Sequence, residues 1–489
     1  MTAPRKKSAP KSKATKSVAK PARAAKKSAQ PARRVARPIR VAKKPARRVA
    51  RPVRVVVNNP AALKIGVARR EISPPSPKLL RPTGMGRLES TYGVLDPLWA
   101  EAMAFEAGGQ AAFVITSDLR TIEHAWVVEA REAIAERTGC PSDRILFSST
   151  HNHCSSPEAD GDSPEARAAL AAANRRIIDA FIDSCVAAWQ DRRPAEIAYA
   201  QAALTERVGE NRRMQFSNGT CVNCWHGGAV CPPGHKYVRP GGPHSTEVRL
   251  MSVRQVGAKR PFAVLVSYPS HPHLSALPYF SGETVGQAKR EVAADLGGEV
   301  TVLWGNHTGG DIDMHCVHPK PPGGLEAELA WFRQSQKTIG RRLAAAVVPA
   351  VRKCAKYQRP ATLKHAYWSS GEDAPERSRI VIVSALVLGD IALASIPGEI
   401  FLTLGQEAMA RSPLPKLLMM GYNGSAAGYQ PRPIGFEQGS YEVMRGPAAS
   451  EDDLLEARPG MFVRRSLRDS GQKVVDRLIA MLTDLAAEK

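Results

Sequence analysis

Short apolar runs alternate with longer segments of helical periodicity along most of this chain. The runs have the length of buried strands and lie at 63–68, 111–118, 145–149, 196–203, 262–268, 300–304, 379–388, 390–396 and 417–420. The helical segments lie at 123–138, 163–189, 282–296, 325–353 and 464–487. This alternation, with both parallel and antiparallel pairings, predicts an α/β fold built as a layered mixed sheet with helices packed on it.

The first 58 residues lack this pattern. They contain 20 of the chain's 69 Lys and Arg residues and no Asp or Glu, and the segment 31–41 recurs nearly unchanged at 45–55. We expect 1–58 to be a disordered basic arm, because so few large apolar side chains cannot offset the entropy lost on ordering. Outside the arm, 49 basic residues face 46 acidic ones, so residues 62–489 are expected to form a near-neutral globular body.

The density of like charge in the arm suits the phosphate backbone of a nucleic acid, or another polyanion, without readout of sequence. A solubility or anchoring tail with no dedicated partner is the alternative. No segment reads as a transmembrane helix, and the N-terminus lacks the apolar core of a secretory signal. These features favour a cytoplasmic location.

Polar residues capable of metal binding or proton transfer follow several expected strands. His151 and His153 come after the run 145–149, and positions i and i+2 of a strand face the same side. The others, each past a later run, are His271, Asp311, Glu399 and Tyr429. Ligand sites of open α/β sheets lie at the C-terminal ends of strands, so we expect the active site there. Two histidines and a carboxylate are a common catalytic zinc set that leaves a position for water.

Each of these residues also has an ordinary structural explanation. His271 and His273 could belong to a solvated turn, and Glu399 could cap a helix that begins near residue 400. Asp311 could organise a turn, and Tyr429 could be a buried phenol. Their shared position at strand ends and their complementary chemistry favour the functional reading.

Taken in chain order, the residues resemble the motifs of neutral, non-lysosomal ceramidases. The segment from Thr150 to Pro157 resembles the family's Thr-His-x-His-x-x-x-Pro motif. The further matches are Asn211-Arg212, His271-Pro272, Gly310-Asp311, Pro397-Gly398-Glu399, Tyr429 and Tyr441. The resemblance covers the ordered body and implies a neutral-ceramidase-like catalytic domain at 62–489.

The resemblance implies a zinc-dependent amidohydrolase that cleaves a linear N-acyl bond of a small-molecule substrate. It implies that Zn²⁺ is bound by His151, His271, Glu399 and Tyr429. It also implies that the catalytic residues are His153, Arg212 and Tyr441. In that reading Arg212 and Tyr441 stabilise the oxyanion or orient the substrate, and His153 passes a proton to the leaving amine.

The sequence departs from the family in two places. The family's Gly-Asp turn continues with a serine, and here Ile312 or Asp313 stands in its place, depending on the alignment. Neither offers a hydroxyl, although Asp313 could hold a substrate cation or act as a base. The family's C-terminal β-sandwich domain has no counterpart in this sequence. A polar or soluble amide is therefore as suitable a substrate as ceramide, and a catalytically inactive scaffold tethered by the arm is the alternative function.

Two further groups of residues have metal-binding chemistry. Residues 216–243 are rich in Gly, Pro and Cys, and we expect them to form a long loop excursion. The ligands there that could hold a structural zinc, rather than remain reduced thiols, are Cys221, Cys224, Cys231, His226 and His235. The histidines around the Asp311 turn, which could bind a second metal or line the pocket, are His307, His315 and His318.

Overall fold

The computed structural model describes residues 63–83, 91–223, 232–274, 277–314, 318, 321–370, 380–425, 428–443 and 469–488. All of them belong to one compact unit, Val57–Lys489. The predicted arm at 1–58 lies outside the described residues, as do Cys224, His226, Cys231 and His315.

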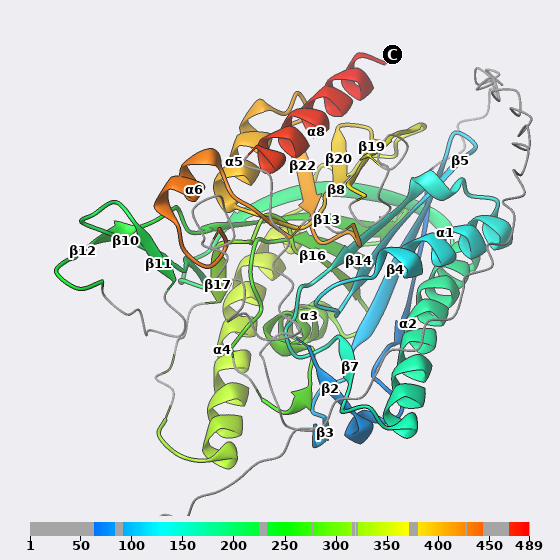
Figure 1. The fold of residues 1–489 in the computed structure, drawn as a ribbon. Coiled ribbons are helices and arrows are strands. Elements are labelled where there is room, and N and C mark those ends of the chain that lie inside the picture. Colours follow the sequence, from blue (N-terminus) through cyan, green and yellow to red (C-terminus); the bar gives the residue numbers. More distant parts are fainter. Residues whose placement is uncertain are drawn as a thin grey trace, which may run out of the picture. The chain divides into compact units, whose positions relative to one another are not determined.

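Eight strands form the larger sheet (Figure 1). Their order across the sheet is β16 (Thr301–Gly305), β14 (Pro261–Ser267), β13 (Glu247–Gln255), β8 (Arg193–Ala203), β1 (Lys64–Glu71), β4 (Trp99–Ala107), β5 (Gln110–Ser117) and β6 (Ile145–Ser149). The two outermost pairs, β16–β14 and β5–β6, are parallel, and the inner pairs are antiparallel. This is the mixed sheet that the sequence predicts. Strands β4 and β13 escaped the prediction, because the alanines and two glutamates of β4 form no apolar run and the polar residues Arg249, Ser252 and Arg254 interrupt β13.

A second sheet of four strands packs on one face of the first. Its order is β18 (Leu363–Ser369), β19 (Ile382–Leu388), β20 (Ile391–Ser395) and β22 (Lys416–Met420). Alternation along each strand divides the side chains between two faces. Val114 of β5, for example, joins Leu393 and Leu418 in the core between the sheets. Its neighbour Ile115 points to the helices on the opposite face.

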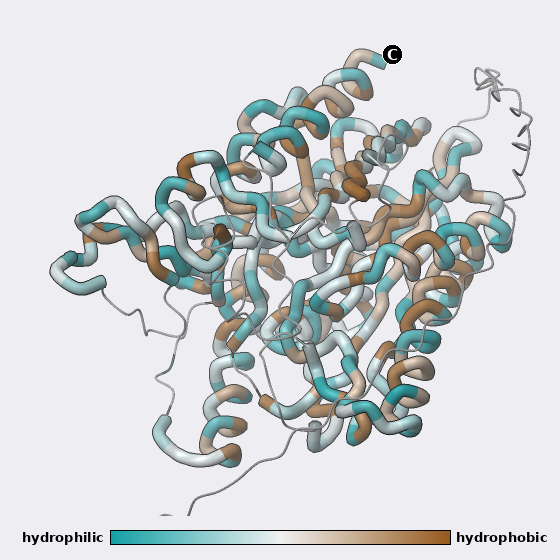
Figure 2. Tube along the Cα trace, in the orientation of Figure 1, coloured by the Kyte–Doolittle hydropathy of each residue, from teal (hydrophilic) through white to brown (hydrophobic). Residues whose placement is uncertain are grey.

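Helices cover the outer faces of both sheets and complete a four-layered α/β/β/α arrangement (Figure 1). The helices on the larger sheet are α1 (His124–Thr138), α2 (Pro164–Gln190), α3 (Glu283–Leu296) and α4 (Leu325–Arg352). Those on the smaller sheet are α5 (Leu402–Arg411) and α8 (Ser470–Ala487). The brown hydrophobic positions of these helices in Figure 2 lie largely toward the sheets. Among the described helices, none is both long enough and apolar enough to cross a membrane.

Local signals set the helix ends as the sequence predicts. The hydroxyl of Ser163 accepts a hydrogen bond from the backbone N–H of Ala166 at 3.0 Å, and Pro164 opens α2. Gly139 ends α1 in the left-handed conformation, with φ of 73°. Helix α8 begins at Ser470, and residues 464–468 of the predicted last helix lie outside the described residues.

Short elements connect the layers. They are η1 (Pro77–Leu79), β2 (Leu80–Pro82), β3 (Gly93–Val94), η2 (Ser142–Arg144), β7 (Pro157–Ala159), β9 (Gly209–Asn211), β10 (Arg213–Phe216), β11 (Cys221–Asn223), β12 (Tyr237–Pro240), β15 (Tyr279–Phe280), β17 (Ile312–Met314), β21 (Glu399–Ile400), β23 (Tyr429–Gln430) and α6 (Pro433–Gln438). The region expected to be a loop excursion, 216–243, is in part a small sheet, since β10 pairs with both β11 and β12. Gly and Pro separate its short strands, so no stretch is long enough to show the alternation of apolar and polar residues that would predict a strand.

The larger sheet curls so that its two ends approach each other. The backbone N–H of Trp304 in β16 donates to the hydroxyl of Thr116 in β5 at 3.4 Å. Strands that lie at opposite ends of the sheet order therefore finish close together. This curvature places the polar residues after β6, β14 and β16 in one region of the molecule.

A buried ion-pair triad joins α3 to the sheet. The Lys289 ammonium lies 2.6 Å from Glu101 Oε1 and 2.7 Å from Asp118 Oδ1. Burial raises the pKa of Glu101 to about 7, against the opposing effect of Lys289. Two carboxylates without the ammonium would be an uncompensated buried charge.

We predict that Lys289→Met lowers the free energy of unfolding by about 3–5 kcal/mol, measured by urea denaturation at pH 8. The loss should shrink as the pH falls, because carboxyls whose folded pKa is raised bind more protons in the folded state. Lys64→Met is the control. It removes the partly exposed Lys64–Glu106 pair (3.5 Å) and should cost less than about 1 kcal/mol. Equal losses in the two variants would contradict the role given to the triad.

Candidate metal centre

Three histidines and a glutamate converge in a buried cluster where strands end. His151 and His153 follow β6, and His271 follows β14. The Nε2 atom of His151 lies 3.1 Å from Nε2 of His271 and 3.2 Å from Nε2 of His153. Glu399 Oε2 lies 3.4 Å from His151 Nε2 and 3.7 Å from His271 Nε2. These residues are up to 248 positions apart in sequence, and the fold brings their ligand atoms together.

Backbone carbonyls orient two of the rings. Nδ1 of His151 lies 2.8 Å from the carbonyl oxygen of Arg120, and Nδ1 of His271 lies 3.4 Å from that of Gly309. These partners place a proton on Nδ1 of each ring, so that the neutral form of the ring directs an Nε2 lone pair at the cluster. Burial, Arg212 and the neighbouring histidines hold the pKa of His271 well below its usual range, so this ring is neutral.

The glutamate supplies a negative charge to the same point. Burial by itself would raise the pKa of Glu399, but His151, Arg120 and Arg212 together hold that pKa below its usual value. An ionised carboxylate therefore faces nitrogen lone pairs at hydrogen-bond range. Such a set of electron donors is repulsive unless a proton or a metal cation lies among them.

The spacing of the donors fits a zinc ion. Zinc–nitrogen bonds of about 2.0–2.1 Å in a tetrahedron separate two ligand atoms by about 3.3 Å. The ligand-atom distances of 3.1–3.7 Å within this cluster match that edge. The residues present therefore fit a zinc ion, and His153 is close enough to be either a ligand or its neighbour.

Two tyrosines lie beside the cluster. The parallel pair β21–β23 sets Tyr429 opposite Glu399. The Tyr429 ring is nearly parallel to the His271 ring, with centroids 6.3 Å apart, and the Tyr441 ring meets Tyr429 edge-on at 5.7 Å. Burial raises the pKa of both phenols, that of Tyr429 strongly. Both predicted tyrosines therefore lie next to the ligand set, as neutral phenols.

Arg212 lies behind Tyr429 in a buried charge network. Its guanidinium carbon is 5.4 Å from the Tyr429 ring centroid. Its Nε donates to Glu442 Oε1 at 2.8 Å and its Nη1 to Asp313 Oδ1 at 3.0 Å. Its Nη2 donates to the carbonyl oxygen of Gly310 at 2.7 Å. Each guanidinium nitrogen thus has a protein partner, which fixes the group beside the tyrosine.

The turn after β16 contains two buried aspartates, Asp311 and Asp313, that have different partners. Asp311 accepts hydrogen bonds from Asn211 Nδ2 at 2.7 Å and from the backbone N–H of Leu402 at 2.8 Å. Asp311, rather than Glu399, thus holds the start of α5, and it performs the turn-organising role considered from the sequence. Asp313 instead forms an ion pair with Arg212. Burial raises the pKa of both aspartates to about 6.

The other candidate metal ligands do not join this cluster among the described residues. His307 bonds Thr308 and lines a separate cavity of about 350 Å³ with Arg249 and Gln406. His318 Nε2 lies 3.2 Å from the hydroxyl of Thr338 on α4. Cys221 is buried, and its predicted partners Cys224, Cys231 and His226 lie outside the described residues.

Comparison with known proteins identifies the architecture. No protein-family model matches this sequence, and no curated protein matches it. The neutral ceramidase from Pseudomonas aeruginosa superposes with a TM-score of 0.65 at 13% identity, covering 87% of this chain and 74% of that one. A ceramidase complexed with C2 gives 0.63 at 13% identity, covering 87% and 75%. This chain has a neutral ceramidase-like fold.

The backbone is strained where the loops that carry His151 and Tyr422 meet. His151 has φ of 58° and Tyr422 has φ of 56°, both in the left-handed region. Their rings stack with centroids 4.2 Å apart and planes 18° apart. His151 and His153 therefore reach one point through a strained turn after β6, and not through strand alternation as expected. Such strain is typical of sites where packing holds functional side chains.

Three site residues of the ceramidase-like fold escaped the sequence reasoning. Tyr422 lies two residues after the end of β22, so the strand-end signal applied to it as well. Glu442 follows Tyr441, and its carboxylate joins Arg212 to Arg213, whose Nη1 lies 3.0 Å from Glu442 Oε2. Asn306 directly follows β16 and had the same signal, but an amide suggested no chemistry.

Asn306 connects the strand ends that form the site. Its Nδ2 donates to the carbonyl oxygen of Thr150 at 2.9 Å and also to that of Ser270. Its Oδ1 accepts from the backbone N–H of Ser270 at 2.8 Å, and its own carbonyl accepts from the N–H of Gly421 at 2.7 Å. The residues that follow these three partners are His151, His271 and Tyr422. One buried amide thus holds three site-bearing loops together.

We predict that Asn306→Asp lowers the free energy of unfolding by about 3 kcal/mol. It removes the donor for two buried carbonyls and adds a buried charge. Chemical denaturation measures the loss. Asn218→Asp is the matched control, because exposed Asn218 uses its Oδ1 as an acceptor and should change stability by less than about 0.5 kcal/mol. A stable Asn306→Asp protein would show that the amide is dispensable.

We also predict that Glu442→Gln destabilises the fold by about 3 kcal/mol, because it leaves two buried guanidinium groups with one carboxylate fewer. Glu437→Gln, an exposed position of α6, should change stability by less than about 0.5 kcal/mol. Thermal and urea unfolding of the two variants give the comparison, and matching curves would contradict the prediction.

Proposed function

We propose that this protein is a zinc-dependent hydrolase of a linear amide, or N-acyl, bond. The observation that carries the proposal is the convergence of His151, His271 and Glu399 at zinc-ligand spacing. The shared fold supports it, since the two superposed structures are ceramidases. The likeness of fold leaves the substrate of this chain open.

The proposed zinc ligands are His151, His271, Glu399 and Tyr429. Zinc, when bound, would polarise the amide carbonyl and lower the pKa of a water molecule. The Nδ1 contact with the Arg120 carbonyl keeps the His151 lone pair directed at the ion. Glu399 offsets part of the ionic charge at a largely buried point.

The proposed catalytic residues surround this ligand set. His153, whose Nε2 is 3.2 Å from that of His151, carries a proton to the leaving amine. Tyr441, as a neutral phenol, donates a hydrogen bond to the developing oxyanion. Arg212 contributes positive charge behind Tyr429, and Glu442 and Asp313 keep its plane in place.

Asp313 bears on the choice of substrate. It pairs with Arg212, and its position corresponds to one reading of the serine in the family motif. A buried acid at this point suits a substrate with a polar or cationic group near the amide better than an entirely apolar one. We therefore propose a small N-acyl substrate, and the screen includes polar amides as well as ceramide-like ones.

Metal analysis of the purified full-length chain tests the zinc centre. We predict about one zinc ion per chain in the wild type and at least a tenfold loss in His151→Ala. Chelation should lower the melting temperature of the wild type and leave that of His151→Ala unchanged. His244→Ala, at an exposed position, is the control and should retain the metal. Purified wild-type protein that lacks stoichiometric zinc would contradict the proposal.

A screen of N-acyl amides and esters then tests hydrolysis. His153→Gln should keep zinc and lose at least about 100-fold in turnover, since general acid–base catalysis contributes that much. Loss of zinc in His153→Gln would instead make His153 a ligand. Zinc binding without turnover on any substrate would favour the inactive binding or scaffold protein. Contact of the basic arm with a polyanion stays a prediction, as does the cytoplasmic location.

A further inference from the structure

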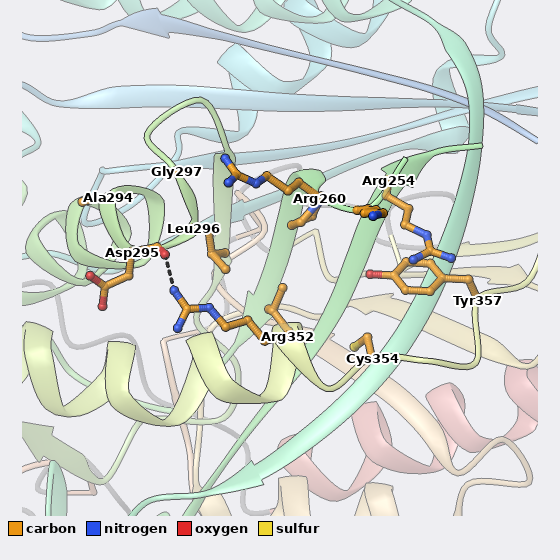
Figure 3. A pocket seen from close by; sticks show the side chains of 12 residues that line it. Arg254, Arg260, Ala294, Asp295, Leu296, Gly297, Arg352, Cys354 and Tyr357 are labelled. Atoms are coloured by element: carbon orange, nitrogen blue, oxygen red, sulfur yellow. Dashed lines mark hydrogen bonds between the residues drawn. The ribbon is translucent and has the colours of Figure 1, made fainter. Parts of the chain in front are cut away.

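A second pocket lies at the opposite end of the larger sheet from the histidine cluster (Figure 3). It has a volume of about 350 Å³ and is lined at the start of β14 and at the C-terminal ends of β13, α3 and α4. Since β14 runs from Pro261 toward His271, its length separates the pocket from the cluster by about 20 Å. The pocket is therefore independent of the proposed zinc site.

The lining of this pocket is strongly basic. Four of its twelve residues are cationic, and Asp295 is the single carboxylate among them. The cationic residues are Arg254, Lys259, Arg260 and Arg352. The globular body has nearly balanced charge, with 49 basic and 46 acidic residues outside the arm, so this concentration is a local feature. Part of this charge offsets the partial negative charge at the C-terminal ends of α3 and α4, and the remainder favours an anion.

Two of the cations are held in position. Arg254 lies 2.6 Å from Glu196 Oε1 and 3.7 Å from the centroid of the Tyr357 ring, and Tyr357 is itself bonded to Ser252 at 2.8 Å. On the other side, Arg352 Nη2 donates to the carbonyl oxygen of Asp295 at 2.6 Å. Figure 3 shows this bond and the Arg254–Tyr357 stack on opposite sides of the pocket. These contacts orient the guanidinium groups before any ligand binds.

The other two cations are uncompensated. Lys259 and Arg260, in the loop between β13 and β14, are exposed and have no hydrogen bond or ion pair with another described residue. Figure 3 shows the Arg260 side chain extending toward Gly297 across the pocket. Exposed cations that surround a cavity and have no carboxylate partner are available to a ligand.

We propose that this pocket binds a small phosphate-bearing anion. Guanidinium groups match the geometry of phosphate oxygens and bind them by paired, charge-assisted hydrogen bonds. Leu296 and Val351 add an apolar part to the lining, which suits an organic group attached to the phosphate. The volume is at the lower end of the range for small-molecule sites.

Cys354 provides a local test, because it lines the pocket and is half-buried. Its alkylation by iodoacetamide is followed by peptide mass spectrometry in the full-length protein at mildly alkaline pH. Phenyl phosphate at several times its Kd should slow the reaction at Cys354 by about fivefold, as expected from mass action. Inorganic phosphate is run in parallel, and the stronger protector identifies whether the organic group contributes.

Charge-reversal variants test whether binding in this pocket is what protects Cys354 from alkylation. Lys259→Glu/Arg260→Glu should abolish the protection. Arg333→Glu/Lys337→Glu, on the exposed surface of α4, makes the same change in net charge and should retain it. Lys259→Gln/Arg260→Gln, which adds no repulsive charge, should weaken protection in the same direction. Equal protection in all variants, or by potassium chloride at equal ionic strength, would overturn the proposal.

Discussion

The buried amide of Asn306 is the interaction on which the site depends. Parallel strands at opposite ends of an eight-stranded sheet would leave their final residues far apart if the sheet were flat. The curled sheet brings them together, and Asn306 joins the carbonyls of Thr150 and Ser270 through one side chain. Its main-chain carbonyl adds the end of β22 at Gly421. These bonds fix the three loops relative to one another, and the histidine side chains on them lie within hydrogen-bond distance of each other.

Buried charge is a second constraint, and the molecule balances it in separate networks. Glu101, Lys289 and Asp118 neutralise one another under α3, while Glu442 serves Arg212 and Arg213 beside the site. The histidine–glutamate cluster differs, because its members are electron donors that face one another. A cation would resolve that repulsion, and the strained turns at His151 and Tyr422 show that packing maintains the arrangement.

The two ends of the larger sheet have different chemistry. The C-terminal ends of β6 and β14 carry the buried histidines of the proposed zinc site. The start of β14 carries exposed cations around an open pocket. A single strand thus links a site suited to a metal and an amide to a site suited to a phosphate. Binding at the two ends can be separated experimentally, because they share no residue.

The sequence by itself determined the α/β class, the helix ends at Ser163 and Gly139, and three of the four strands of the smaller sheet, β19, β20 and β22, because these follow from local periodicity and local capping. It also supplied the ordered ligand candidates through the resemblance to ceramidases. It missed β4, whose alanines form no apolar run, and also β13 and β18, whose apolar residues are interrupted by polar ones. It also missed the roles of Tyr422, Glu442 and Asn306. Only the tertiary structure decided that Asp311 holds α5 while Glu399 faces the histidines. Those assignments depend on contacts between residues distant in sequence, which the curvature of the sheet sets and no local pattern encodes.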